Sequence, residues 1–150
     1  MYQRDYQTGG EVVTISRSTE LGTITLSDLI FAEVIERSFN QKECKGRVWP
    51  ATSRGRLIGT DQKSGIQEFA HEIEVKMGPD DNAVSIEFSI IIRFGTSIKK
   101  ITGLIGDYIA EAIKEDHGER PIFIKIRISG VKSKQIARRD VEVLKSYGTV

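Results

Sequence analysis

Cysteine and histidine are scarce in this chain of 150 residues, which has one cysteine, Cys44, and two histidines, His71 and His117. A single cysteine excludes an internal disulfide and is typical of a reducing compartment. Metal sites need clustered ligands, and these three residues have no ligand spacing. We therefore expect neither a metal site nor a bound cofactor.

An excess of charge and a long apolar run are also missing. The 22 basic and 21 acidic residues leave a net charge of +1, so no overall field draws the chain toward nucleic acid or an acidic membrane. No stretch approaches the roughly 20 apolar residues of a membrane span, and the N-terminus lacks the apolar core of a signal peptide. The sequence thus predicts a cytoplasmic protein with no direct membrane span.

The apolar patterns that are present predict one α+β domain. Short β segments at residues 11–17 and 22–26 suggest a hairpin, and Ser27 is placed to cap a helix over residues 29–39. Alternation from His71 to residue 77 and over residues 84–94, around a turn at 78–82, predicts an antiparallel hairpin with one buried face. That face includes Phe94. A second helix starts two residues after Gly95 and ends at His117-Gly118, and a last strand covers residues 122–130.

These elements have the order β-α-β-β-α-β, which predicts a two-layer sandwich with a mostly antiparallel or mixed sheet and both helices on one face. An extra N-terminal β segment joins it. The domain spans residues 11–131, between a flexible arm at 1–10 and a basic tail at 132–150. Within the second helix, Gly103 and Gly106 predict close backbone contacts, because glycine is otherwise unfavourable there.

The sequence does not decide the secondary structure of two segments. Residues 41–65 are expected to be mostly loop, with a short strand at Val48 and Trp49 as an addition. The tail fits either a short amphipathic helix through Ile136, Val141 and Leu144 or an added strand at 141–144.

The start of the second helix is a candidate anion site. A helix N-terminus exposes unpaired N–H groups, and lysines there oppose the helix dipole unless an anion neutralises them. The structural alternative, which we favour, is that Thr96 or Ser97 caps the helix and the lysines are solvated. The residues concerned are Gly95, Thr96, Ser97, Lys99 and Lys100.

No catalytic set stands out. Residues 59–64 end in Lys-Ser but lack the glycines of a phosphate loop, and Cys44 has no evident histidine partner. Glu72, Glu74 and Glu87 are typical of the solvent face of a hairpin. We therefore expect a protein that is not an enzyme. A small-ligand or enzymatic site would need residues 95–100 to meet the loop that ends at Ser64.

Basic residues offer a second functional hypothesis, a nucleic-acid-binding module. Only Trp49 and Tyr147 lie near them in the sequence as stacking residues, so a solvated surface is favoured. The residues of this alternative are Arg47, Arg54, Arg56, Arg138 and Arg139.

Four segments carry a family resemblance: "GTITLSDLIFAEVIE" from Gly22, "ECKGRVW" from Glu43, the strand and helix of residues 84–113, and "IKIRISGV" ending at Val131. They resemble, in order, the alkaline shock protein 23 (Gls24) family. That family has a hydrophobic strand ending in Tyr/Phe-Gly before its second helix and a last strand closing on Gly-Val. Phe94-Gly95 and Gly130-Val131 occupy those places.

The resemblance implies a non-enzymatic binding or scaffold protein linked to cell-envelope or alkaline stress. It also implies a protein partner, such as a membrane-anchored envelope protein that holds the chain at the membrane. The exposed edges of so small a sheet suggest the alternative of a homo-oligomer, since open edges pair between chains. The bulkier first helix, with Glu36, Arg37 and Phe39, departs from the family pattern.

Overall fold

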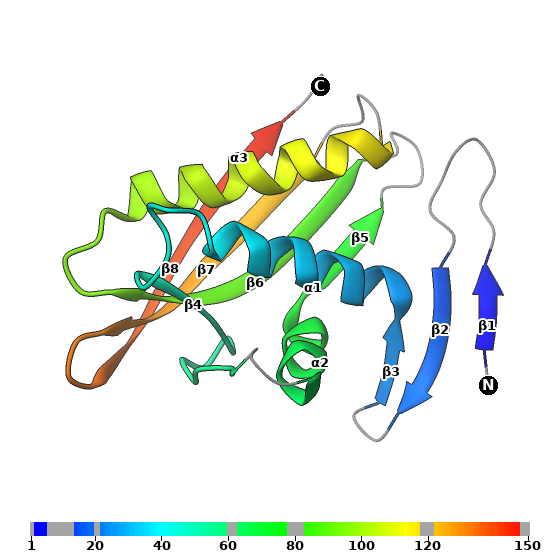
Figure 1. The fold of residues 1–150 in the computed structure, drawn as a ribbon, viewed down its shortest axis with the longest axis horizontal. Coiled ribbons are helices and arrows are strands. Elements are labelled where there is room, and N and C mark those ends of the chain that lie inside the picture. Colours follow the sequence, from blue (N-terminus) through cyan, green and yellow to red (C-terminus); the bar gives the residue numbers. More distant parts are fainter. Residues whose placement is uncertain are drawn as a thin grey trace.

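The computed structural model describes residues 2–5, 14–19, 22–59, 63–77, 83–117 and 122–147 (Figure 1). Three strands near the N-terminus form a small antiparallel sheet: β1 (Tyr2–Asp5), β2 (Thr14–Thr19) and β3 (Gly22–Thr25). Three helices follow along the chain: α1 (Leu26–Phe39), α2 (Lys63–Glu72) and α3 (Ile98–His117). The main sheet has five strands: β4 (Val48–Ala51), β5 (Glu74–Met77), β6 (Val84–Arg93), β7 (Ile122–Lys132) and β8 (Ile136–Tyr147).

The main sheet is mixed, with the order β4-β6-β7-β8. Strands β6 and β7 are parallel and are joined by α3, while β4 and β8 are antiparallel to their neighbours. Strand β5 pairs with the first half of β6, on the edge where β4 pairs with its second half. Because β6 and β7 are parallel, their carboxyl ends lie at the same end of the sheet, where α3 begins.

One face of the main sheet is covered by α1 and α3, which lie side by side across it (Figure 1). Strands β6 and β7 turn alternate apolar side chains toward these helices, as period-two burial requires. In β7 the buried residues are Ile122, Ile124, Ile126 and Ile128. At the α2 end of the core the rings of Phe39, Phe69 and Phe88 pack together, with centroids 6.1–6.4 Å apart.

The opposite face is interrupted by a bulge in β7. Ile90 lies opposite Ile128 and Ile91 lies opposite Gly130, so Ser129 has no opposite residue in β6. The Ser129 hydroxyl donates to the Thr52 carbonyl at 2.7 Å and holds the loop after β4 against the sheet. Ser129 and Ile91 are therefore buried, although they lie away from the helices.

The last strand is tied to the longest helix. The Tyr147 hydroxyl donates to Asp107 Oδ1 at 2.9 Å. Burial, together with this hydrogen bond, raises the pKa of Tyr147. A Cβ at Gly106 would collide with the Tyr147 hydroxyl, whereas one at Gly103 would meet nothing within 4 Å. The predicted close contact is confirmed at Gly106 and wrong at Gly103.

The α+β class, the mixed sheet and the two covering helices are confirmed, and two details differ from prediction. Helix α1 begins at Leu26, so Ser27 lies inside it instead of capping it. His71 and Glu72 end α2 and do not start a strand, because Phe69, Ala70 and Ile73 are buried at helical spacing. Of the two alternatives for the tail, the structure has the strand, β8, and Val48 and Trp49 belong to β4. The predicted turn at 78–82 lies outside the described residues.

Candidate functional site

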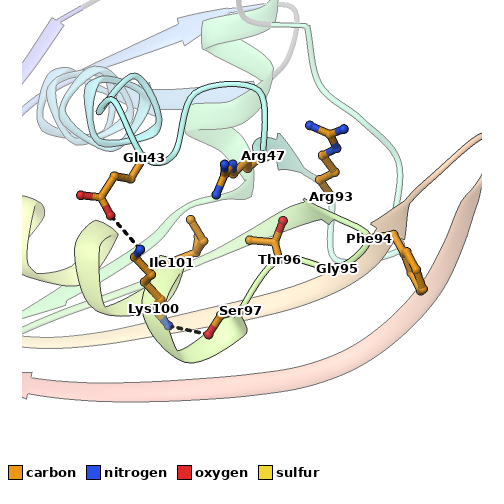
Figure 2. Close-up of a pocket in the computed structure, with 9 residues that line it drawn as sticks. All are labelled: Glu43, Arg47, Arg93, Phe94, Gly95, Thr96, Ser97, Lys100 and Ile101. Atoms are coloured by element: carbon orange, nitrogen blue, oxygen red, sulfur yellow. Dashed lines mark hydrogen bonds and ion pairs between the residues drawn. The ribbon is translucent and has the colours of Figure 1, made fainter.

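Two adjoining open cavities lie where β6 and β7 end and α3 begins. The first, of about 410 Å³, is lined by Arg47, Arg93 and Lys100 together with the backbone turn at Gly95 (Figure 2). The second, of about 470 Å³, is lined by Trp49, Lys132 and Lys134. Arg93 and Phe94 line both cavities. We call this surface the basic end: Arg47, Arg93, Lys100, Lys132 and Lys134 with the rings of Trp49 and Phe94.

The backbone explains why these side chains converge. Arg93 N donates to the Arg47 carbonyl at 2.8 Å, and Phe94 N donates to the Lys132 carbonyl at 2.8 Å. Three chain segments are therefore joined directly at the end of β6. Gly95 has φ +86°, a conformation that favours glycine, and it turns the chain from β6 toward α3. Ligand sites in sheets with parallel strands tend to lie beyond the carboxyl ends of those strands, as this surface does.

The charges of the basic end are mostly unpaired. Lys100 Nζ lies 3.2 Å from Glu43, the acidic residue of the first cavity, in a surface ion pair. Lys132 Nζ lies 4.6 Å from the Trp49 ring centroid, a cation–π contact. Among the described residues, no carboxylate lies within ion-pair distance of Arg47, Arg93 or Lys134. An anionic ligand would find these three cations free.

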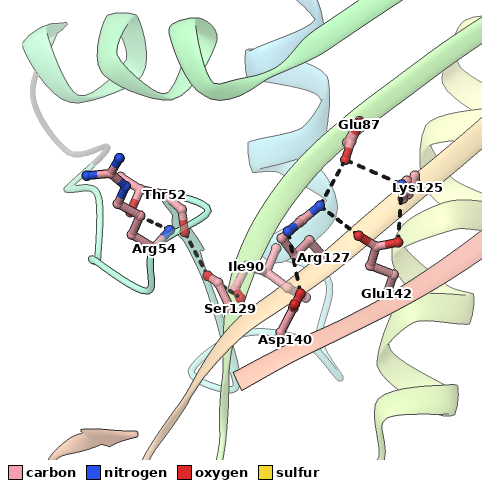
Figure 3. Close-up of polar contacts among 9 residues, drawn as sticks. All are labelled: Thr52, Arg54, Glu87, Ile90, Lys125, Arg127, Ser129, Asp140 and Glu142. Carbon is pink, nitrogen blue, oxygen red and sulfur yellow. Dashed lines mark hydrogen bonds and ion pairs between the residues drawn. The ribbon is translucent and has the colours of Figure 1, made fainter. Parts of the chain in front are cut away.

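On the face of the main sheet that lies away from the helices, Lys125 and Arg127 are paired with carboxylates (Figure 3). Arg127 lies 2.7 Å from Glu142 and 3.4 Å from Asp140. Lys125 lies 3.1 Å from Glu142 and 3.8 Å from Glu87. These two cations are matched by carboxylates from neighbouring strands, whereas Arg138 and Arg139 on β8 form no ion pair with a described residue.

The candidate anion residues are partly brought together by the structure. Gly95, Thr96, Ser97 and Lys100 line the first cavity, whereas Lys99 is exposed on α3 and does not. Ser97 Oγ accepts the Lys100 N–H at 3.2 Å, so Ser97 is the helix cap, as the favoured interpretation expects. The first turn of α3 is therefore capped and also borders a cavity.

The five arginines of the nucleic-acid alternative are divided between two places. Arg47 lies at the basic end. Arg54 and Arg56 lie in the loop over Ser129, and Arg56 forms an ion pair with Glu68. Arg138 passes close to Gly55, and Arg139 donates to the Arg138 carbonyl at 3.0 Å. These residues do not form one surface with Arg47 at its centre.

The cysteine and histidine residues take no part in the basic end. Burial raises the pKa of the Cys44 thiol, with a further contribution from Glu43, so the thiol is a poor nucleophile. His71 is exposed at the end of α2. In the described part of the chain, no three residues of the types His, Cys, Asp and Glu are placed to hold a metal ion.

Residues 60–62 of the rejected phosphate loop lie outside the described residues. Neither cavity is lined by residues 52–59, so this described part of the loop shares neither cavity with residues 95–100. The earlier part of the long loop does contribute, through Glu43, Gly46 and Arg47.

Four residues of the basic end were not predicted as site residues from the sequence: Arg93, Phe94, Lys132 and Lys134. Phe94 was expected on the buried face of its strand, and that expectation is wrong because its side chain is 74% exposed. Strand β6 ends at Arg93, and the turn at Gly95 breaks the alternation before Phe94 can point inward. The Phe-Gly pair at the strand end was the available signal.

Three comparisons with known proteins found no match for the chain. No family model, no curated protein and no solved structure matches it. Within the described residues, no helix combines the length and apolar character needed to cross a membrane.

Proposed function

We propose that the chain is a non-enzymatic binding protein whose basic end recognises a phosphate-bearing macromolecule. The observation that supports this proposal is the convergence of Arg47, Arg93 and Lys134, free of carboxylate partners, on two adjoining cavities. The net charge of the chain is only +1, so this local excess is offset by acidic residues placed elsewhere. Phosphate contacts through arginine and lysine supply most of the affinity of such proteins.

The proposed ligand is bound and not transformed. Both cavities are lined by cations, aromatic rings, hydroxyl side chains, one isoleucine and backbone, and the one acidic group there, Glu43, is engaged by Lys100 at 3.2 Å. A general acid–base reaction needs a positioned group that exchanges a proton near the working pH. None of the cavity residues fits that role.

A charge-removal experiment tests this function. The probe is a fluorescein-labelled abasic oligodeoxynucleotide of twelve units, which carries phosphates without bases. In the triple variant Arg47→Gln, Arg93→Gln and Lys134→Gln we expect at least a tenfold loss of affinity at low salt. The slope of log affinity against log salt should fall by about 2, because each phosphate contact with a single strand contributes roughly 0.7. Fluorescence anisotropy between 50 and 200 mM salt measures both.

The matched control carries the same change of charge on the other arginine cluster: Arg54→Gln, Arg138→Gln and Arg139→Gln. We expect its affinity to stay within about threefold of the parent chain. An equal loss in both triple variants would show that only overall charge matters. If the parent chain does not bind the probe at low salt, the proposed function is wrong.

We also infer a second function, self-assembly, from the exposed edge strand β8. This strand has twelve residues, and its Leu144 side chain is 68% exposed. Long open edges pair readily with other strands. An antiparallel pairing with a second copy centred on Leu144 would place the two Leu144 side chains together and Glu142 opposite Ser146, without opposing like charges. The scaffold role that the family resemblance implies is consistent with such assembly, and its link to envelope stress stays a prediction.

Replacing Leu144 tests the self-assembly. We expect the parent chain to sediment as a dimer at high micromolar concentration and Leu144→Lys to sediment as a monomer, because two opposed lysines repel. Ile30→Lys is the control, since Ile30 is another exposed apolar residue (48%) on α1, away from the edge. Sedimentation velocity over a concentration series gives the result, and a parent chain that remains monomeric throughout contradicts the pairing.

A further inference from the structure

Phe94 is the most exposed large apolar side chain of the described residues, at 74%. It follows Arg93 at the end of β6 and lines both cavities of the basic end. In Figure 2 its ring projects away from the loop and from the other labelled side chains. Most of the ring is therefore open to a ligand beside the cations.

The second ring of the basic end is already engaged. Trp49 is partly buried, and Lys132 Nζ lies 4.6 Å from the centroid of its ring. This contact holds a lysine at the second cavity. Trp49 thus positions a cation, while Phe94 offers a free aromatic surface beside it.

We propose, building on the function proposed above, that the ligand is a single-stranded nucleic acid with one base stacked on Phe94 and its phosphates along Arg47, Arg93 and Lys134. Proteins that bind single strands combine a positively charged groove with exposed aromatic side chains, because every base has a π face. Bases in a duplex are stacked on their neighbours and cannot use such a ring. The basic end has both features of this pattern: the cations that line the two cavities and the exposed ring of Phe94.

An anionic membrane fits the surface less well. Interfacial binding uses several apolar side chains that enter the bilayer together. At the basic end Phe94 is the one exposed large apolar side chain among the described residues that lines the cavities. The cations also line two open cavities, with volumes of about 410 and 470 Å³. Such concave surfaces suit a flexible chain of phosphates better than a flat bilayer does.

Substitutions of Phe94 separate these possibilities. We expect the parent chain to bind labelled dT12 and rU12 more tightly than the abasic twelve-unit strand, with dT12 and rU12 compared to distinguish DNA from RNA. Phe94→Leu keeps an apolar side chain but loses the ring, and should weaken dT12 or rU12 binding by about 5- to 150-fold, the loss of one base–aromatic stack. Phe94→Tyr should bind dT12 and rU12 as tightly as the parent chain. The Phe94 variants and the parent chain should all bind the abasic strand equally.

Trp49 provides a second readout, because it is the only tryptophan in the chain. Binding of dT12 beside Lys132 should change the Trp49 emission in the parent chain and in Phe94→Tyr. A strand bound elsewhere would leave this emission unchanged, and that result would overturn the assignment to the basic end.

The remaining outcomes are distinct. If dT12 and rU12 bind no tighter than the abasic strand and Phe94→Leu has no effect, stacking is refuted while the phosphate-binding function stands. If the abasic strand does not bind at all, both proposals fail. If phosphatidylserine vesicles bind to the parent and to Phe94→Leu but not to Phe94→Ala, the ring serves as an apolar membrane contact and the nucleic-acid proposal is overturned.

Discussion

Phe88→Ala is expected to destabilise the protein by about 3–5 kcal/mol, the usual cost of removing a buried phenyl ring. Phe88 is 1% exposed and lies in the central strand β6. Its ring centroid is 6.3 Å from that of Phe39 on α1 and 6.4 Å from that of Phe69 on α2. The substitution would leave a cavity that neither helix can close without moving. Urea unfolding followed by circular dichroism measures the loss.

Phe94→Ala is the matched control for this prediction. It removes the same kind of ring from the residue directly after the end of β6, where the side chain is 74% exposed. Its free energy of unfolding should stay within about 0.5 kcal/mol of the parent value, as for most surface changes. Equal losses at both positions would contradict the placement of Phe88 in the core and Phe94 on the surface.

Gly55→Ala is expected to cost about 2–4 kcal/mol, from two separate effects. Gly55 has φ +88°, where a residue with a Cβ is strained. A Cβ there would also lie 2.8 Å from the Ser129 carbonyl oxygen, a backbone atom of the central strand β7 that cannot move aside. The loop after β4 would have to lift away from Ser129, whose hydroxyl donates to Thr52 (Figure 3).

Gly46→Ala separates strain from collision. Gly46 has φ +77° and nothing within 4 Å of a Cβ, so this variant should show only the strain of about 1–2 kcal/mol. A larger loss for Gly55→Ala than for Gly46→Ala in urea unfolding therefore measures the contact with Ser129. Equal losses would show that the loop does not rest on the sheet as described.

The central part of the fold was accessible from the sequence because burial there follows a simple period. Strand β7 alternates isoleucines with polar residues, since one face meets α1 and α3 and the other meets solvent or carboxylates. Helix α3 ends at His117, as its flanking residues predicted. Helix α2 was missed because its last residues, His71 and Glu72, continue without a break into the alternation of β5.

The sequence did not decide between a helix and a strand for the segment that forms β8. Its acidic residues pair with basic residues of the neighbouring strand, and this pairing exists only in the folded chain. Arg127 and Glu142 are 2.7 Å apart in space but belong to neighbouring strands, so along the sequence the segment looked like a basic tail. The basic end could not be predicted from the sequence for a similar reason, because its residues meet only in the folded chain. Arg47, Arg93 and Lys132 come from three distant segments, and two backbone hydrogen bonds of 2.8 Å join them. The sequence had pointed to Lys100 with its neighbours and to Arg47, but in two separate hypotheses.

The position of β6 has a consequence for biosynthesis. Its first neighbours, β4 and β5, precede it in the chain, but its parallel neighbour β7 follows only after the whole of α3. A ribosome adding about 5–20 residues per second therefore needs several seconds between the completion of Arg93 and that of Lys132. Throughout that interval the nascent chain carries an isoleucine-rich strand with one unsatisfied edge and an incomplete helical cover, which makes this segment a natural substrate for chaperones during translation.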